Sequence, residues 1–377
     1  MRPGFPTLLL GLGVLSVARL SAATPEWSIS LEERLLGDGN VLRLSDSDVQ
    51  RLEDDPAFQT DVQGVEALKL EHRATASMDL RLTQRKGVVG SLQSLAGGKP
   101  GQGRLRLSWE GKWTQVEESS AMGNHSQRLQ LGWQPRTGWG VDVAWRHLEN
   151  FDLRQFNDRD TGQEHGASFD SDGGTLTLKA RGKDRCAWFR QPGLSLSAGT
   201  STEYYNAWFT EYDMESTQLG AELGWRMPLG LDAGLGYTFV SADNVGFAGA
   251  QEGQVNLGAD SESGDATHQE DQVSVDMGWS GAAALKGLSA NAALLLRDRH
   301  YQSELGELLD PYHAGRHDRR WTFTLRGKVE LGAGLSLSPL VEREWRKSTA
   351  AWGGVGRVKD YAVLRWGLGL RWQLSSR

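Results

Sequence analysis

The chain has 377 residues, a net charge of −7 and a hydrophobic fraction of 38%, and its mean hydropathy is −0.47. This small apolar fraction argues against a large buried core, and no basic stripe indicates a nucleic-acid partner. The single cysteine, Cys186, excludes an intrachain disulfide, and its surroundings do not mark a redox site. Glycine (47) and tryptophan (15) are abundant, which suits tight turns and membrane–water interfaces respectively.

Residues 1 to 23 match a secretory signal peptide. Arg2 begins a short basic region, the apolar run from 8 to 15 is too short to span a bilayer, and Ser21-Ala22-Ala23 supplies small residues for a signal peptidase. We predict cleavage after Ala23, which leaves residues 24 to 377 as the mature protein; an uncleaved anchor is the alternative. No later segment reaches 18 uninterrupted apolar residues, so only a closed barrel of strands would hold the mature chain in a membrane.

The first part of the mature chain predicts two strands. Residues 26 to 34 alternate apolar Trp27, Ile29 and Leu31 with polar side chains, and residues 66 to 84 alternate over a longer stretch. The acidic tract from about 46 to 64 predicts a loop, with a short helical turn over about 49 to 53. Residues 87 to 103 contain Gly and Pro and predict a connection.

From there, strands alternate with brief turns and long polar loops. The brief turns contain the Gly and Pro that tight hairpins need, at 135 to 138, 191 to 193, 227 to 230, 285 to 287 and 332 to 334. The long connections cover about 151 to 172, 206 to 213, 243 to 269, 302 to 318 and 347 to 357. Outer-membrane barrels have this asymmetry, with short periplasmic turns and long outer loops.

The last strand shows the alternation most clearly. Between 358 and 374, Leu364, Trp366 and Leu368 fall on one side, and Arg365 and Arg371 on the other. The segment from 320 to 331 has the same pattern. We therefore predict an all-β fold, a transmembrane antiparallel up-and-down β-barrel of about fourteen strands. Strand counts from roughly twelve to sixteen are compatible with the pattern.

Tryptophans support the membrane interpretation because they divide into two groups. Trp133, Trp139, Trp188, Trp225, Trp279 and Trp372 lie near the brief turns or the chain end, and Trp113, Trp145, Trp208, Trp321 and Trp345 lie near the long loops. We expect two aromatic girdles. The alternative is a soluble β-sandwich with core tryptophans.

The polar faces of the strands supply the candidate functional residues. The lumen-lining candidates are Arg73, Arg81, Arg104, Arg106, Lys179, Arg181, Glu222, Arg226, Arg297, Arg320, Arg326, Lys328, Glu330, Glu342, Arg365 and Arg371. Over all the polar faces, which include further positions such as Arg146, Arg299 and Arg346, basic residues outnumber acidic ones roughly two to one. A water-filled lumen of this kind would favour anions, with selectivity set by arginines such as Arg326, Arg365 and Arg371. Alternatively, the charges pair across strands and fill the lumen of a rigid structural barrel.

Enzyme and metal chemistry find little support. His125 and Ser126 are adjacent, so on a strand they would point to opposite faces and could not form a base–nucleophile pair. Asp158, Asp160, Asp170 and Asp172 match no calcium loop. We expect no enzyme activity, cofactor or metal; an outer-membrane hydrolase is the least favoured alternative.

From Pro25 onward the chain resembles bacterial outer-membrane β-barrels of the porin-like sort, on the strength of Ser21-Ala22-Ala23, the hairpin rhythm, the Trp groups and the terminal strand. Residues 319 to 374 also resemble the barrel portion of surface lipoprotein assembly modifiers. The resemblance implies a channel in the bacterial outer membrane for passive diffusion of small solutes. It also implies contact with membrane lipid, lipopolysaccharide and the assembly machinery. A structural or export barrel with an unknown envelope partner is the alternative.

Overall fold

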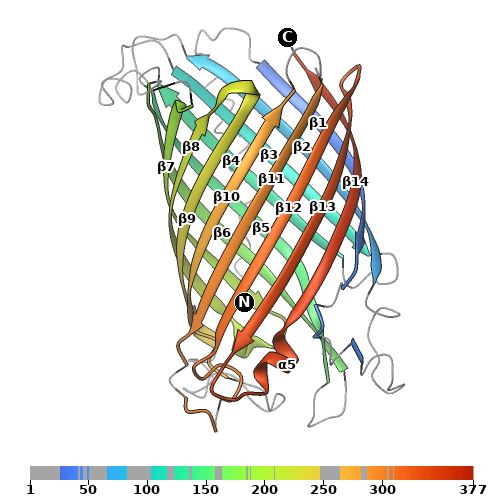
Figure 1. The fold of residues 1–377 in the computed structure, drawn as a ribbon, viewed down its shortest axis with the longest axis vertical. Helices are drawn as coiled ribbons and strands as arrows, with labels where there is room; N and C mark the ends of the chain where they lie inside the picture. The colour runs from blue at the N-terminus through green and yellow to red at the C-terminus, as the bar shows by residue number, and fades with distance from the viewer. Residues whose placement is uncertain are drawn as a thin grey trace.

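The described residues form a closed barrel of fourteen strands (Figure 1). The computed structural model describes residues 26–40, 43–45, 49–50, 66–82, 103–116, 123–135, 138–157, 164–183, 186, 188–207, 209–246, 264–281, 287–303, 305–308 and 310–376. The strands are β1 (Glu26–Asp38), β2 (Ala67–Leu82), β3 (Gly103–Val116), β4 (Asn124–Pro135), β5 (Trp139–Asn157), β6 (Glu164–Arg181), β7 (Arg190–Tyr205), β8 (Met214–Arg226), β9 (Leu231–Asn244), β10 (His268–Ser280), β11 (Leu288–Tyr301), β12 (His317–Gly332), β13 (Leu335–Thr349) and β14 (Tyr361–Ser375).

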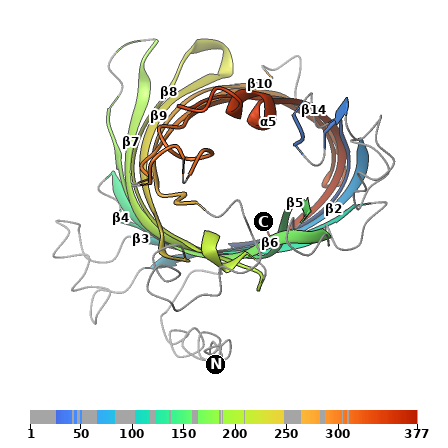
Figure 2. The same cartoon turned by 90° about the horizontal axis from the view of Figure 1, so that it is seen from below.

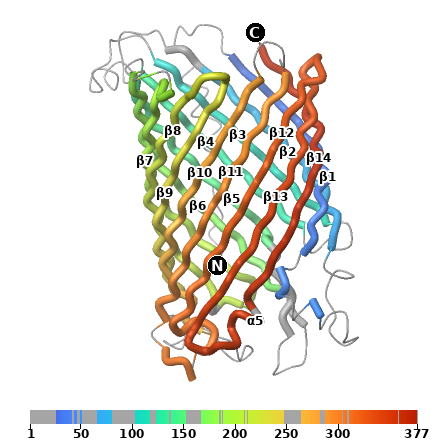
Figure 3. Tube along the Cα trace, viewed as in Figure 1, coloured from blue at the N-terminus to red at the C-terminus, as the bar shows by residue number. Residues whose placement is uncertain are grey.

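Every strand pairs antiparallel with its sequence neighbours, and β1 pairs with β14 to close the sheet. The register of that seam runs from Ser28 opposite Ser375 to Asp38 opposite Arg365. Figure 3 shows the first and last strands, blue and red, side by side. Closure leaves no unpaired edge, which is the condition for a sheet to lie in lipid. The predicted up-and-down barrel of about fourteen strands is confirmed.

Alternate side chains define two faces of this sheet. On β14 the outward Leu364, Trp366 and Leu368 are about half exposed, at 53%, 49% and 48%, whereas the inward Tyr361 and Val363 are only 4% and 3% exposed. The same outward exposure of large apolar side chains recurs on nearly every strand. An apolar surface of this extent is stable only against lipid, so the exterior is that of an outer-membrane barrel. Among the described residues, no helix has the length and hydropathy needed to cross a bilayer.

The barrel has two different ends, which we call the turn end and the loop end. Five hairpins (β4–β5, β6–β7, β8–β9, β10–β11 and β12–β13) meet at the turn end, together with the C-terminal strand. Between β12 and β13 the turn consists of Ala333 and Gly334, both with positive φ (50° and 78°). Such angles match the twist of the flanking strands in a two-residue hairpin. A Cβ on Gly334 would collide with the carbonyl oxygen of Gln373, so this turn requires glycine.

The two tryptophan groups occupy the two ends of the outward face. Trp113, Trp145, Trp321 and Trp345 lie toward the loop end, and Trp133, Trp139, Trp225, Trp279 and Trp372 toward the turn end. Trp188 is exposed in the β6–β7 turn, and Trp208 is outside the described residues. The predicted girdles are therefore present.

Three sequence predictions about connections are wrong. The brief turn predicted at 191 to 193 lies within β7, which begins at Arg190, so the chain turns before that residue. Most of the stretch from 151 to 172, predicted to be a loop, is strand: β5 continues to Asn157 and β6 begins at Glu164, with irregularities in the register between Leu148 and Arg154. Polar and charged residues occupy both alternating sets of positions here, so the apolar–polar alternation that marks strands is absent from the sequence. A long connection, from 83 to 102, also joins β2 to β3 at the turn end, so long connections are not confined to one end. Of the helical turn predicted over 49 to 53, only residues 49 and 50 are described, and they are helical.

One connection at the loop end turns into the barrel opening. Figure 2 shows the orange segment between β11 and β12 inside the ring, with helix α5 (Val355–Lys359) beside the rim. Asp310, at 1% exposure, anchors this inward connection (residues 302 to 316). Its carboxylate accepts hydrogen bonds from the Asp265 amide (3.0 Å), the Ser303 hydroxyl (2.7 Å) and the His313 amide (3.1 Å). The inward connection narrows the lumen from one side.

Candidate functional site

The strand registers place the predicted lumen-lining positions on the inward face of the barrel. The position of Arg81 is opposite Arg104, and the Arg81 side chain is outside the described part of the structure. The inward residues do not gather in one place. Within the described part of the chain, they contribute to three cavities and to the wall around them.

The largest of these, the loop-end cavity, has a volume of about 590 Å³. It is lined by strands β5 and β7–β14, helix α5 and the inward connection. Basic side chains dominate its lining: Arg43, Arg146, Arg297, Arg299, Arg316, Arg320, Arg346 and Lys359. The carboxylates in the lining are Glu203 and Glu270. A small polar cavity with this imbalance of charged side chains carries a positive potential.

Aromatic rings and a few acids hold these arginines in place. Arg299 donates from Nε to Glu270 (2.8 Å), and Arg316 donates from Nε to Asp318 (2.8 Å). The guanidinium of Arg316 also lies over the ring of Tyr301, 4.4 Å from its centroid. Arg316 lies outside the membrane-spanning strands. Burial alone would lower the pKa of Arg316, but the charge of Tyr301 and the hydrogen bonds and charge of Asp318 outweigh burial and raise it. Arg316 therefore stays charged at the mouth of the cavity.

Three further arginines line the cavity with looser contacts to acidic groups than those of Arg299 and Arg316. Arg346 donates to the backbone carbonyl of Lys359 (2.7 Å), and Arg320 is 3.8 Å from the nearest oxygen of Glu344. The Nε of Arg297 is buried and has no hydrogen-bond partner among the described residues. A buried donor without a partner is costly, and an anion would satisfy it. Buried guanidinium donors of the described residues therefore line this cavity.

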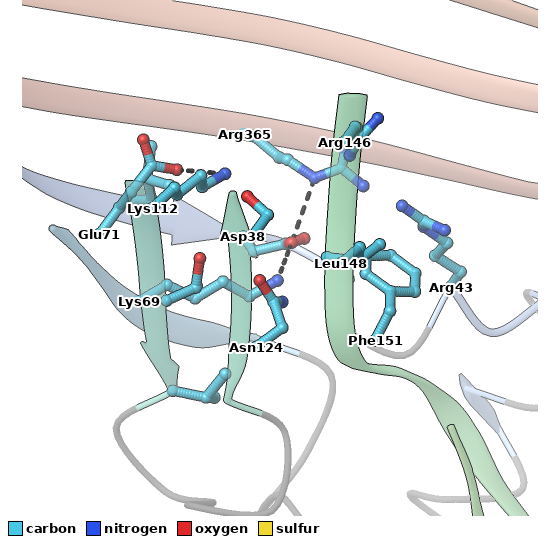
Figure 4. Close-up of a pocket in the computed structure, with 14 residues that line it drawn as sticks. Asp38, Arg43, Lys69, Glu71, Lys112, Asn124, Arg146, Leu148, Phe151 and Arg365 are labelled. Atoms are coloured by element: carbon cyan, nitrogen blue, oxygen red, sulfur yellow. Dashed lines mark hydrogen bonds and ion pairs between the residues drawn. The ribbon is translucent and has the colours of Figure 1, made fainter. Parts of the chain in front are cut away.

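The seam cavity, of about 250 Å³, lies beside the junction of β1 and β14 (Figure 4). Asp38 accepts hydrogen bonds from Lys69 (2.7 Å) and Arg365 (3.1 Å), and Glu71 pairs with Lys112 (2.6 Å). Its charges are therefore largely paired. Arg43 and Arg146 line both this cavity and the loop-end cavity, so the two adjoin each other.

The turn-end cavity, of about 230 Å³, gathers four of the predicted candidates, Arg104, Arg106, Lys179 and Arg181, around Asp142. Asp79 binds Arg104 (2.6 Å) and Arg106 (2.9 Å), and Asp142 pairs with Lys179. Two carboxylates for four bases leave this opening basic as well. Among the described residues, basic side chains therefore outnumber carboxylates in both the loop-end and the turn-end cavity.

The remaining candidates lie on the inward wall outside these three cavities. They include Arg73, Glu222, Arg326 and Arg371 and two local pairs, Arg226 with Asp232 (3.2 Å) and Lys328 with Glu330 (3.0 Å). Glu342 pairs with Arg365 (2.7 Å). Of the arginines expected to set selectivity, Arg326 and Arg371 are therefore away from the basic cavities, and Arg365 is neutralised by Asp38, Glu342 and Glu344.

Sequence reasoning missed Arg43, Arg316 and Lys359, which lie outside the strands. The sequence contains a signal for two of them. Arg316 is two positions before Asp318 and four before Arg320, so it continues the inward positions of β12. Lys359 continues the inward positions of β14 in the same way, two positions before Tyr361. Arg43 has no such signal. It lies in the turn after β1 with a positive φ of 52°, and only tertiary structure places it against the lumen.

His125 and Ser126 point to opposite faces, as expected. His125 is outward and stacks on Trp113 (5.1 Å between ring centroids), whereas Ser126 lines the seam cavity. The two cannot act as base and nucleophile on one substrate. In the acidic cluster, Asp172 pairs with His147 (3.0 Å) and Asp170 accepts from the Asn150 amide (2.8 Å). Asp158 and Asp160 are outside the described residues.

No family model and no curated protein matches the chain. Solved structures with similar architecture include a bacterial polysaccharide outer membrane secretin (7% identity, TM-score 0.43, covering 91% of this chain and 98% of that one). They also include Pseudomonas aeruginosa OccK2 (12%, 0.40, 93% and 98%) and the outer-membrane protein OmpT of Vibrio cholerae (10%, 0.41, 93% and 99%). At these values the similarity concerns barrel architecture alone and says nothing of solute or mechanism.

Proposed function

We propose that the protein is an outer-membrane channel through which small anionic solutes diffuse passively, without enzymatic activity. The observation that carries the proposal is the loop-end cavity, where eight basic side chains face two carboxylates. We assign the turn end to the periplasm because short turns lie there in bacterial barrels. The loop-end cavity then lies on the extracellular side, where it selects what enters.

Charge, rather than shape alone, would make this cavity selective. Guanidinium groups bind carboxylate and phosphate oxygens in a two-point geometry, and a narrow lumen with low-dielectric walls strengthens that attraction. Arg297, Arg320 and Arg346 are in register on three neighbouring strands, so they offer an anion successive binding groups rather than one deep trap. The basic turn-end cavity would continue this path toward the periplasm.

Single-channel recording in planar lipid bilayers tests the proposal. We expect the purified protein to conduct, and its reversal potential under a potassium chloride gradient to indicate chloride selectivity. Arg297→Gln with Arg320→Gln removes two charges from the loop-end cavity and is expected to move the reversal potential toward zero. Arg226→Gln is the control, because Arg226 lies outside the cavity and pairs with Asp232. Absence of current, or cation selectivity in the unmodified protein, would refute the proposal.

A structural or export barrel remains the second candidate, favoured by the paired charges of the seam cavity and by the inward connection that narrows the lumen. Such a barrel would act with a periplasmic or inner-membrane partner. Co-purification of a stoichiometric envelope protein together with a non-conducting barrel would support this candidate against the channel.

A further inference from the structure

Three side chains on the outer surface form a cluster that the proposed channel does not use. Asp298 and His300 lie near the end of β11, and His317 begins β12, all at the loop end. They face outward, because the inward positions of these strands are Arg297, Arg299 and Asp318, Arg320. From this cluster we propose a binding site for a transition-metal ion of the zinc class on the extracellular rim of the barrel.

The β-ladder brings the three ligands together. His300 and His317 are directly opposite each other, and their rings are stacked with centroids 4.3 Å apart and planes 7° apart. Asp298 is two residues before His300, so both project from the same face. Its Oδ1 already contacts Nε2 of His317. One potential ligand atom from each residue lies within 4.8 Å of the others.

The donor set determines the class of metal. Two imidazoles and one carboxylate suit Zn²⁺, Cu²⁺ or Ni²⁺, whereas Ca²⁺ and Mg²⁺ require mainly oxygen ligands. Zinc binds these groups at about 2.0–2.2 Å, so the ligand atoms have to approach to roughly 3–4 Å of each other. Rotation of the exposed His300 ring provides that movement. Three protein ligands leave one tetrahedral position for water.

A neighbouring arginine orients the carboxylate. Nη2 of Arg319 donates to Oδ2 of Asp298 at 3.3 Å, which leaves Oδ1 directed at His317. Hydrogen bonds of this kind fix the orientation of metal ligands and affect affinity strongly. The positive charge of Arg319 repels a metal cation and so lowers the metal affinity somewhat, but Arg319 is exposed and solvent screens this repulsion.

The position of the cluster allows access from water and suggests a consequence of binding. Trp321 stacks with Trp345 (6.3 Å) two outward positions farther into the membrane than His317, so the cluster is on the aqueous side of this aromatic girdle. His300 is exposed. A bound ion would link β11 to β12 at the base of the inward connection, and so hold the segment that narrows the loop-end cavity.

Isothermal titration of detergent-solubilised, tag-free protein with Zn²⁺ tests the site. We expect binding of one ion, and a loss of affinity of about 10–100-fold or more in His300→Ala and in Asp298→Asn. His125→Ala is the matched control, because His125 is also an outward histidine at the loop end beside an acid, Glu149 at 3.7 Å. It is expected to leave affinity unchanged.

A spectroscopic measurement separates ligation from a structural effect of the substitutions. With Cu²⁺ as the probe, electron paramagnetic resonance should show coupling to two nitrogen donors in the unmodified protein and to one in His300→Ala. The absence of zinc binding up to millimolar concentrations would overturn the proposal. Unchanged affinity in both His300→Ala and Asp298→Asn, or copper spectra identical in the two proteins, would do the same. None of these results depends on whether the barrel conducts.

Discussion

Arg365 on β14 donates a hydrogen bond to Asp38 on β1 at 3.1 Å, although the two residues are 327 positions apart in the sequence. Asp38 is 4% exposed and also accepts from Lys69 on β2 at 2.7 Å. Arg365 in turn reaches Glu342 on β13 (2.7 Å). These contacts join four consecutive strands across the seam, so they reinforce the backbone pairing that closes the barrel.

Replacing Arg365 with alanine is expected to weaken the seam. The change removes the shared partner of Asp38, Glu342 and Glu344 and leaves buried carboxylates with less compensation. We expect a decrease in unfolding free energy of about 1–3 kcal/mol. Urea unfolding of the protein in lipid vesicles, followed by tryptophan fluorescence, measures it. Arg226→Ala breaks an exposed pair and is expected to cost about 0–1 kcal/mol; an equal effect of both variants would show that the seam contacts carry no special weight.

Glu33 on β1 and His72 on β2 form a polar pair that faces lipid. They are opposite each other in the ladder and in contact. Their outward neighbours include Leu31, Leu35 and, on β14, Leu370. A carboxylate in this apolar band needs its partner, so we expect His72→Leu to lower the unfolding free energy by about 1–3 kcal/mol. Vesicle-based urea unfolding again provides the measurement.

The double variant tests whether the pair itself is favourable. Replacing a desolvated pair with apolar residues of similar size is often neutral or stabilising, so Glu33→Leu with His72→Leu is expected to be at least as stable as the unmodified protein. If His72→Leu alone were as stable as the unmodified protein, the Glu33 carboxylate would have to reach water without a partner. The pair would then make no contribution to stability.

Asp213, between β7 and β8, predicts a pH dependence of stability outside the membrane. Burial raises the pKa of Asp213 from 3.8 to about 6, although the Tyr205 amide donates to its carboxylate (2.7 Å). Because the folded pKa is above the unfolded one, the folded state binds the proton more tightly. The stabilisation that proton binding to Asp213 gives the folded state is complete below about pH 4 and is lost as the pH rises through 6. Asp213→Asn keeps the acceptor oxygen, and we expect it to raise the melting temperature above pH 6 but not at pH 4.

Asp310 in the inward connection is a control for Asp213, because the pKa of Asp310 is shifted in the opposite direction. Burial alone would raise the pKa of Asp310, but hydrogen bonds from His313 and Ser303 outweigh burial and lower it. Its contribution is therefore present at neutral pH and lost as the pH falls through its folded pKa. Asp310→Asn is expected to destabilise the connection at pH 7, with the difference from the unmodified protein shrinking in acid. A stabilising Asp310→Asn at pH 7 would contradict this assignment.

The alternation of side chains could be interpreted from the sequence because a membrane strand has only two environments. Leu364, Trp366 and Leu368 meet lipid, Arg365 and Arg371 meet the lumen, and no loop or partner is needed to explain the difference. The barrel class, the strand count and the inward positions follow from that pattern. It fails from 151 to 172, where polar and charged residues occupy both alternating sets of positions although most of the stretch is strand.

The amino-acid sequence by itself determined which side chains face inward, since that depends on position along a single strand. Only the tertiary structure decided which of these charges remain unneutralised, because pairing depends on the register between strands and on segments that enter the lumen. Arg365 meets Asp38 only after the ring closes, and Arg43 and Arg316 reach the loop-end cavity only through irregular backbone. Residues far apart in sequence share one electrostatic environment, so the basic site is a property of the closed barrel rather than of any strand.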